Sequence, residues 1–166
     1  MILVVDDEAD SRKLLTSLLS SEGYEVRAAD GGELALASVS IRPPELILLD
    51  LRMPGMDGFE VCRKLKQSEE NRNIPVIILS GSGGMADKVE GLQLGAVDYI
   101  TKPFQREELI VRVRTHLELA RLRKDLQQQV EQRTNQLRES EERFRAMADA
   151  APVMIWASDV DRRRTF

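Results

Sequence analysis

The fold is decided by the stretch ILVVDDE at residues 2–8, an apolar run that ends in three acids. Its first four residues are consecutively apolar, which is typical of a strand buried on both faces of a sheet. Asp6, Asp7 and Glu8 follow directly. Two carboxylates about 4 Å apart repel each other by roughly 1 kcal/mol in water and roughly 4 kcal/mol at an effective dielectric constant near 20. An acid pair at the end of a core strand therefore requires a nearby positive charge or other interaction that offsets this repulsion.

The composition is that of a folded domain. Of 166 residues, 42% are hydrophobic and 31% are charged, which provides for a core of ordinary size. Cys62 is the single cysteine, so an internal disulfide and a cysteine-based zinc site are both excluded, and we expect it to be a small core residue. No basic start precedes an apolar stretch, and no run of 18 apolar residues occurs. We therefore expect no signal peptide, no membrane span and a cytoplasmic location.

The charge argues against one class of partner. Residues 1–104 carry 17 acids and 11 bases, whereas residues 105–151 carry 9 acids and 10 bases. The front part lacks the basic face that DNA binding requires, so we expect no direct contact with nucleic acid.

Residues 1–104 alternate between short apolar runs and amphipathic stretches. The apolar runs are ILVV (2–5), EVRAA (25–29), ELILLD (45–50), PVIILS (75–80) and VDYIT (97–101), and the amphipathic stretches lie near 10–22, 32–41, 57–67 and 85–94. This alternation predicts an α/β fold with a doubly wound, five-stranded parallel sheet.

Polar side chains stand at the carboxyl end of four of these strands. Asp6 and Asp7 end the first, Asp50 the third and Ser80 the fourth, and Lys102 follows the fifth. Ligands bind at that edge of such sheets, so these five residues should converge there. A divalent cation between the carboxylates would turn their repulsion into attraction, and oxygen-only ligands favour Mg²⁺. A hydroxyl and an ammonium beside them would suit a phosphoryl group on the Asp50 carboxylate.

Four motifs carry a resemblance to a known family: ILVVDDE, LILLDLRMPGMDG, PVIILSG and DYITKPF. In this order they resemble the receiver domain of two-component response regulators, over residues 1 to about 118. The resemblance implies a flavodoxin-like sheet in the order 2-1-3-4-5. We take residues 1–118 as the receiver, with its fifth helix continuing onward.

The resemblance also implies a role for each site residue. Asp50 would be the phosphoacceptor, and Mg²⁺ would be the cofactor, held by Asp6, Asp7, Asp50 and the backbone carbonyl of Arg52. Ser80 and Lys102 would contact the phosphate. Tyr99 would be the aromatic switch that moves inward as Ser80 turns to the phosphate, and Pro103 would follow a cis peptide bond.

A long helix without glycine or proline is predicted from about Gln105 to about Ala150. Apolar residues recur along it at heptad-like spacing with one stutter, at Leu119, Leu122, Leu126, Val130, Leu137 and Phe144. We expect this seam to form a homodimer through residues 105–150, with 119–150 as a coiled-coil linker. The alternative is an independent helix that frays beyond about residue 125.

Residues 140–166 resemble the opening of a PAS sensor domain, and 151–166 would be its truncated start. A whole PAS domain needs about 100 residues, so either the chain is a piece of a longer protein or this tail packs on a neighbouring helix.

These features predict a phosphoaccepting receiver in a two-component phosphorelay. Its phosphodonor would be a sensor histidine kinase or a phosphotransfer protein, and its own chemistry would be limited to accepting and slowly hydrolysing the phosphoryl group. The alternative is a regulatory fragment of a hybrid histidine kinase or diguanylate cyclase whose catalytic module lies beyond residue 166. A third hypothesis is a docking domain that is never phosphorylated.

Overall fold

The computed structural model of the chain describes residues 1–81 and 84–150, which fall into two compact units that divide after Lys124. Ten elements follow one another along these described residues, and the bounds of each lie within one residue of the predicted range. They are β1 (Ile2–Val5), α1 (Ala9–Ser21), β2 (Val26–Ala29), α2 (Gly32–Ile41), β3 (Leu46–Asp50), α3 (Gly58–Gln67), β4 (Val76–Ser80), α4 (Met85–Gln93), β5 (Asp98–Thr101) and α5 (Arg106–Ala150).

The five strands form one sheet in the order β2-β1-β3-β4-β5, and every neighbouring pair is parallel. The predicted fold class, including the strand order and the long C-terminal helix, is confirmed. Because all strands run in the same direction, their carboxyl ends lie at one edge of the sheet.

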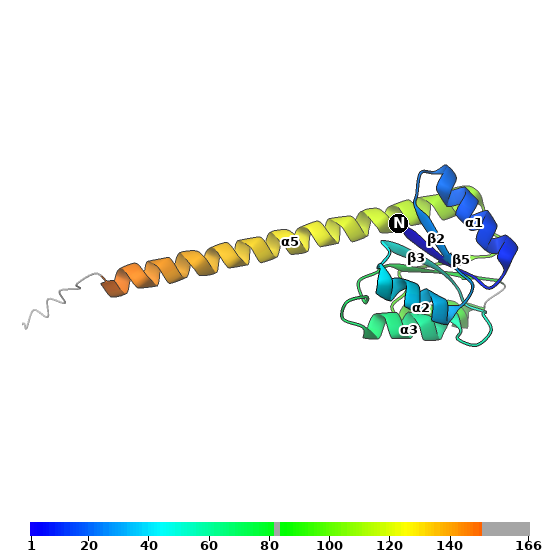
Figure 1. The fold of residues 1–166 in the computed structure, drawn as a ribbon, viewed down its shortest axis with the longest axis horizontal. Coiled ribbons are helices and arrows are strands. Elements are labelled where there is room, and N and C mark those ends of the chain that lie inside the picture. The colour runs from blue at the N-terminus through cyan, green and yellow to red at the C-terminus, as the bar shows by residue number, and fades with distance from the viewer. Residues whose placement is uncertain (82–83, 151–166) are drawn as a thin grey trace, which may run out of the picture. The chain divides into compact units, whose positions relative to one another are not determined.

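Helices α2 and α3 lie on one face of the sheet, and α1 with the first part of α5 lies on the other (Figure 1). Alternate strand residues divide between the two hydrophobic layers that result. On one face, residues such as Leu3, Ile47 and Ile78 pack against α2 and α3, and Cys62 is fully buried there as expected. On the other face, residues such as Val4, Leu48 and Ile77 pack against α1 and the first part of α5. Burial on both sides explains why β1, β3 and β4 are apolar without interruption.

The connection from β3 to α3 brings the backbone unusually close to the end of β3. A Cβ atom on Gly58 would lie 2.3 Å from the carbonyl oxygen of Asp50, so only glycine fits there without a shift. Asp57 caps α3 by accepting a hydrogen bond from the Glu60 backbone N–H at 2.8 Å. Together the cap and the glycine hold the loop that carries Asp50 and Leu51 against the sheet.

The last helix, α5, has two environments. Its first turns pack on the sheet through buried residues up to Leu117. From Leu119 onward its large apolar side chains are exposed, at 55–74% of their surface, and the second unit begins at Asp125. The predicted PAS-like segment, 151–166, lies outside the described residues. Among those the structure describes, no helix is both long enough and apolar enough to cross a bilayer.

Candidate functional site

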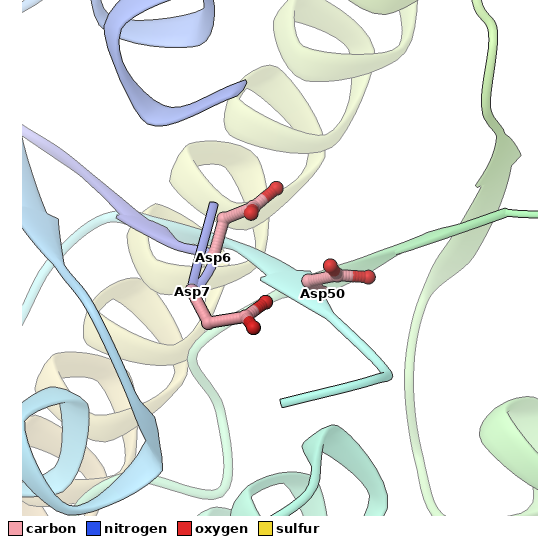
Figure 2. Close-up of side chains that lie close together, drawn as sticks. All are labelled: Asp6, Asp7 and Asp50. Carbon is pink, nitrogen blue, oxygen red and sulfur yellow. The ribbon is translucent and has the colours of Figure 1, made fainter. Parts of the chain in front are cut away.

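Three carboxylates meet beyond the ends of β1 and β3 (Figure 2). Asp6 and Asp7 follow β1, and Asp50 is the last residue of β3. One ligand oxygen from each lies within 4.8 Å of the other two. Asp6 and Asp50 are buried whereas Asp7 is exposed, so the cluster opens to solvent on the Asp7 side.

Asp6 is the most constrained of the three. Its Oδ1 accepts a hydrogen bond from the Glu8 backbone N–H at 2.9 Å, and its Oδ2 accepts one from the Ser11 hydroxyl at 2.6 Å. The Arg12 guanidinium donates to its backbone carbonyl at 2.7 Å. These bonds tie the end of β1 to the first turn of α1, so that Asp6 is a fixed point of the site.

Lys102 follows β5, an edge strand of the sheet, and its side chain reaches the carboxylates at the ends of β1 and β3. Its Nζ lies 2.7 Å from Asp6 Oδ2 and 3.1 Å from Asp50 Oδ2. Its backbone N–H donates to the Ser80 carbonyl, and the peptide bond to Pro103 is cis, as the family resemblance implies. Burial by itself lowers the pKa of Lys102, but its hydrogen bonds to the two carboxylates outweigh that effect and raise it. The ammonium is therefore a permanent positive charge in the site.

The environment of Asp50 disfavours its ionised form. Burial raises the pKa of this carboxyl, and the negative charge of Asp6 raises it further. Lys102 and the Arg52 backbone N–H act in the opposite direction without cancelling the rise. The site therefore has more negative charge than its own groups neutralise.

Ser80 lies in β4 and Tyr99 in β5, and neither side chain forms a hydrogen bond to the three carboxylates within the described residues. Ser80 is fully buried at the end of β4, and its hydroxyl donates to the Gly81 carbonyl at 3.3 Å. Tyr99, in β5, is buried as well, with 8% of its surface exposed.

Arg52 stands two residues beyond Asp50, with an exposed side chain. Its guanidinium Nη2 is 4.0 Å from Asp87 Oδ2, at the start of α4. The predicted role of its carbonyl as a metal ligand stays a prediction.

Comparison with known proteins agrees with this geometry. The sequence model of the family described as "Response regulator receiver domain" matches residues 2–114, more than half of the chain. The chain belongs to this family.

Relatives and solved structures show the extent of the similarity. The receiver is 47% identical over 114 residues to Response regulator PleD of Caulobacter vibrioides, an alignment covering 69% of this chain and 25% of PleD. It is 44% identical over 116 residues to the phosphate regulon transcriptional regulatory protein PhoB of Pseudomonas aeruginosa, covering 70% of this chain and 51% of PhoB. The crystal structure of the NtrX receiver domain from Brucella abortus superposes with a TM-score of 0.67 at 38% identity, covering 71% of this chain and 98% of that one.

A receiver domain from a signal transduction histidine kinase of Syntrophus aciditrophicus is similar too, with a TM-score of 0.67 at 37% identity, covering 70% of this chain and 89% of that one. The chain spans about a quarter to a half of the length of the curated relatives it matches. The comparison therefore identifies it as a receiver of the two-component type, a class that takes phosphate from histidine kinases and generally binds Mg²⁺ at an acidic pocket.

The donor set of this receiver fits Mg²⁺. All three side chains offer carboxylate oxygens, which suit a hard divalent ion, and Mg²⁺ takes one or two carboxylates while keeping several waters. Asp7 accepts no hydrogen bond from residues 1–81 or 84–150, and the Lys102 ammonium approaches Asp50 at Oδ2 alone. Asp7 and Asp50 thus have the fewest internal contacts of the three acids, and Asp6 completes the set of carboxylates beside them.

Several functional contacts of the receiver were not predicted from the sequence. Asp98, at the start of β5, accepts from Arg112 at 2.7 and 2.9 Å and lies 3.0 Å from His116 Nε2. The separation of Arg112 and His116 by four residues on one helix face was the only available signal. No sequence motif predicts the hydrogen bond from the Ser11 hydroxyl to Asp6.

Proposed function

We propose that this receiver accepts a phosphoryl group on Asp50 in a Mg²⁺-dependent reaction and thereby switches an output carried by its long helix. The observation that carries the proposal is the meeting of Asp6, Asp7 and Asp50 with the Lys102 ammonium at the carboxyl edge of the sheet. Mg²⁺, held by Asp6, Asp7, Asp50 and the Arg52 carbonyl, would supply positive charge to the phosphoryl oxygens.

The two oxygens of Asp50 have different roles in this reaction. One oxygen of the Asp50 carboxylate would attack phosphorus, and the other would remain available to Mg²⁺, with Lys102 Nζ 3.1 Å from Oδ2. The attack forms the bond from that carboxylate oxygen to phosphorus, while the bond from phosphorus to the donor's leaving atom breaks. The phosphodonor is a sensor histidine kinase or a phosphotransfer protein, in keeping with the family.

The switch follows from the charge that the reaction adds. A phosphoryl group brings about −1.5 to −2 charges and three acceptor oxygens. Lys102, now shared between Asp6 and Asp50, gains a third acceptor. The Ser80 hydroxyl, whose present bond to Gly81 is long at 3.3 Å, is a second donor that can turn to the phosphate. Tyr99, on the neighbouring strand β5 opposite Ile78, is the aromatic switch.

The long helix supports the proposal of a dimeric linker. Its seam residues are exposed at more than half of their surface, namely Leu119, Leu122, Leu126, Val130, Leu137 and Phe144. A stripe of this kind is stabilised by burial against an identical stripe. We propose a homodimer through residues 105–150, with 119–150 as a coiled-coil linker that leads to the start of a PAS-like domain at 151–166.

A second candidate is the regulatory part of a hybrid histidine kinase or diguanylate cyclase. One observation favours it: a similar solved receiver belongs to a signal transduction histidine kinase. In either case the site acts in the cytoplasm and contacts no nucleic acid directly.

The test of the phosphoacceptor is the intact mass of the chain after incubation with acetyl phosphate. We expect a gain of one phosphoryl group, about 80 Da, with Mg²⁺ present and none in chelator or in Asp50→Ala. An unchanged mass in the folded, Mg²⁺-loaded protein would instead support a docking domain that is never phosphorylated.

The test of the linker is disulfide crosslinking between cysteines placed on the seam at Leu126 or Leu137 in a Cys62→Ser background. We expect crosslinked dimers from both positions, with yields that change when the chain is phosphorylated. Gln128→Cys, which lies off the seam, is the matched control. Equal yields from seam and control positions would contradict the dimer, and yields indifferent to phosphorylation would contradict its role in the switch.

A further inference from the structure

The buried position of Tyr99 leaves one polar atom unsatisfied. The ring packs in the hydrophobic layer that contains Val76, Ile78 and Ala96. Its hydroxyl is buried and has no hydrogen-bond partner within residues 1–81 and 84–150. A buried hydroxyl without a partner disfavours the conformation that buries it. The apolar packing of the ring works against this cost, and any further contact that the ring makes adds to that packing.

Helix α4 supplies such a contact. The Nζ of Lys88 lies over the ring of Tyr99, 5.1 Å from its centroid, within the range of a cation–π interaction. Within the part of the chain that the structure describes, no carboxylate lies within 4.0 Å of this ammonium. The aromatic face of Tyr99 is thus a direct contact of this ammonium.

The approach of α4 to the sheet fixes the height of Lys88 above the ring. A Cβ on Gly91 would lie 2.5 Å from Ile78 Cδ1, so glycine lets the helix lie close to β4. Ile78 is the register partner of Tyr99. Lys88 precedes Gly91 by three residues and so shares its face of the helix.

The backbone of Tyr99 is held separately. Its N–H donates to Asp98 Oδ1 at 2.8 Å, and Arg112 of α5 binds the same carboxylate. With the backbone pinned, the freedom that remains at this position is rotation of the side chain.

We propose that Lys88 is a positioning residue for Tyr99, whose ring it holds in the buried position beneath α4 before Asp50 carries a phosphoryl group. The orphaned hydroxyl opposes this contact, so loss of the Lys88 ammonium should shift the ring toward a solvent-exposed position. The inference deepens the proposed function and rests on it only for its signalling consequence.

Fluorine NMR of the chain labelled with 3-fluorotyrosine tests this directly, because the sequence has only two tyrosines. Tyr24→Phe assigns the signals, and no phosphodonor is present. In Lys88→Gln the ratio of solvent-exposed to buried Tyr99 signal should rise about two- to fivefold, the factor that corresponds to a partly exposed cation–π contact. Lys88→Arg keeps a cation over the ring and should retain the wild-type spectrum.

Lys64→Gln is the matched control, because it removes an exposed lysine charge from α3. Unfolding midpoints of all variants establish that they are folded, and Lys88→Met replaces Lys88→Gln if that variant is unfolded. An unchanged Tyr99 signal without the Lys88 charge would overturn the proposal, and so would an equal shift in Lys64→Gln. Since the sample contains no phosphodonor, failure of Asp50 phosphorylation in the mass measurement is a separate result.

Discussion

Replacement of Asp50 by asparagine should stabilise the metal-free receiver. At the 4.8 Å limit that separates the ligand oxygens of the cluster, two carboxylates repel by about 0.9 kcal/mol in water and about 3.5 kcal/mol at an effective dielectric constant of 20. The variant loses the attraction of Lys102, but that ammonium keeps Asp6 at 2.7 Å. The raised pKa of Asp50 means that burial and Asp6 together outweigh Lys102. We therefore expect Asp50→Asn to raise the free energy of unfolding by about 1–3 kcal/mol at pH 7 in chelator.

Magnesium should narrow or reverse this difference in stability. A ligand that binds only the folded state stabilises it by about 2.7 kcal/mol at a hundred times its dissociation constant. The wild-type chain should show that gain, and Asp50→Asn, with one charged ligand fewer, should show much less of it. Urea unfolding followed by circular dichroism, with and without Mg²⁺, measures both free energies.

Asp10→Asn is the control for the loss of one negative charge. Asp10 lies in the exposed first turn of α1 and, among residues 1–81 and 84–150, forms an ion pair only with Lys13, at 3.7 Å. Its free energy of unfolding should stay within about 0.5 kcal/mol of wild type, with the full response to Mg²⁺. An Asp50→Asn chain no more stable than wild type in chelator, or equal stabilisation of both chains by Mg²⁺, would contradict a net repulsion at Asp50 that the cation relieves.

Three further predictions concern the surroundings of the site. Gly58→Ala places a Cβ 2.3 Å from the Asp50 carbonyl, so urea unfolding should show a loss of at least about 1–3 kcal/mol; a neutral result would contradict this. Asp57→Ala removes the cap of α3 and should cost about 1 kcal/mol in the same assay, whereas Asp57→Ser should restore most of it. Burial raises the pKa of Asp98, but Arg112 and its other donors lower it overall, so its contribution to stability is present at neutral pH and is lost as pH falls below its usual 3.8. The destabilisation by Asp98→Asn should accordingly shrink in acid unfolding curves, and a pH-independent difference would contradict the ion pair.

The fold was predictable because each strand carries its own signal. Continuous apolar runs such as 46–49 and 76–79 fit only a sheet covered on both faces, and glycine or proline marks most of the junctions between elements. No single apolar run indicates the strand order, which was predicted from the resemblance to the receiver family. The structure confirms it.

The convergence of the acids was predictable, because topology brings the strand ends to one edge. The partners of each acid were not. That Asp6 would be held by Ser11, and that Asp98 would bind Arg112, depends on side-chain directions across elements that no local pattern encodes. The buried position of Tyr99 was missed for the same reason, since it depends on how closely α4 approaches the sheet.

The most direct test of the central claim is to locate the phosphoryl group. After incubation with acetyl phosphate and Mg²⁺, borohydride reduction converts an aspartyl phosphate to homoserine, which peptide mass spectrometry assigns to one residue. We predict homoserine at position 50 alone, and none when Mg²⁺ is removed by chelator. Homoserine at Asp6 or Asp7, or none at all in the folded and Mg²⁺-loaded chain, would contradict Asp50 as the phosphoacceptor.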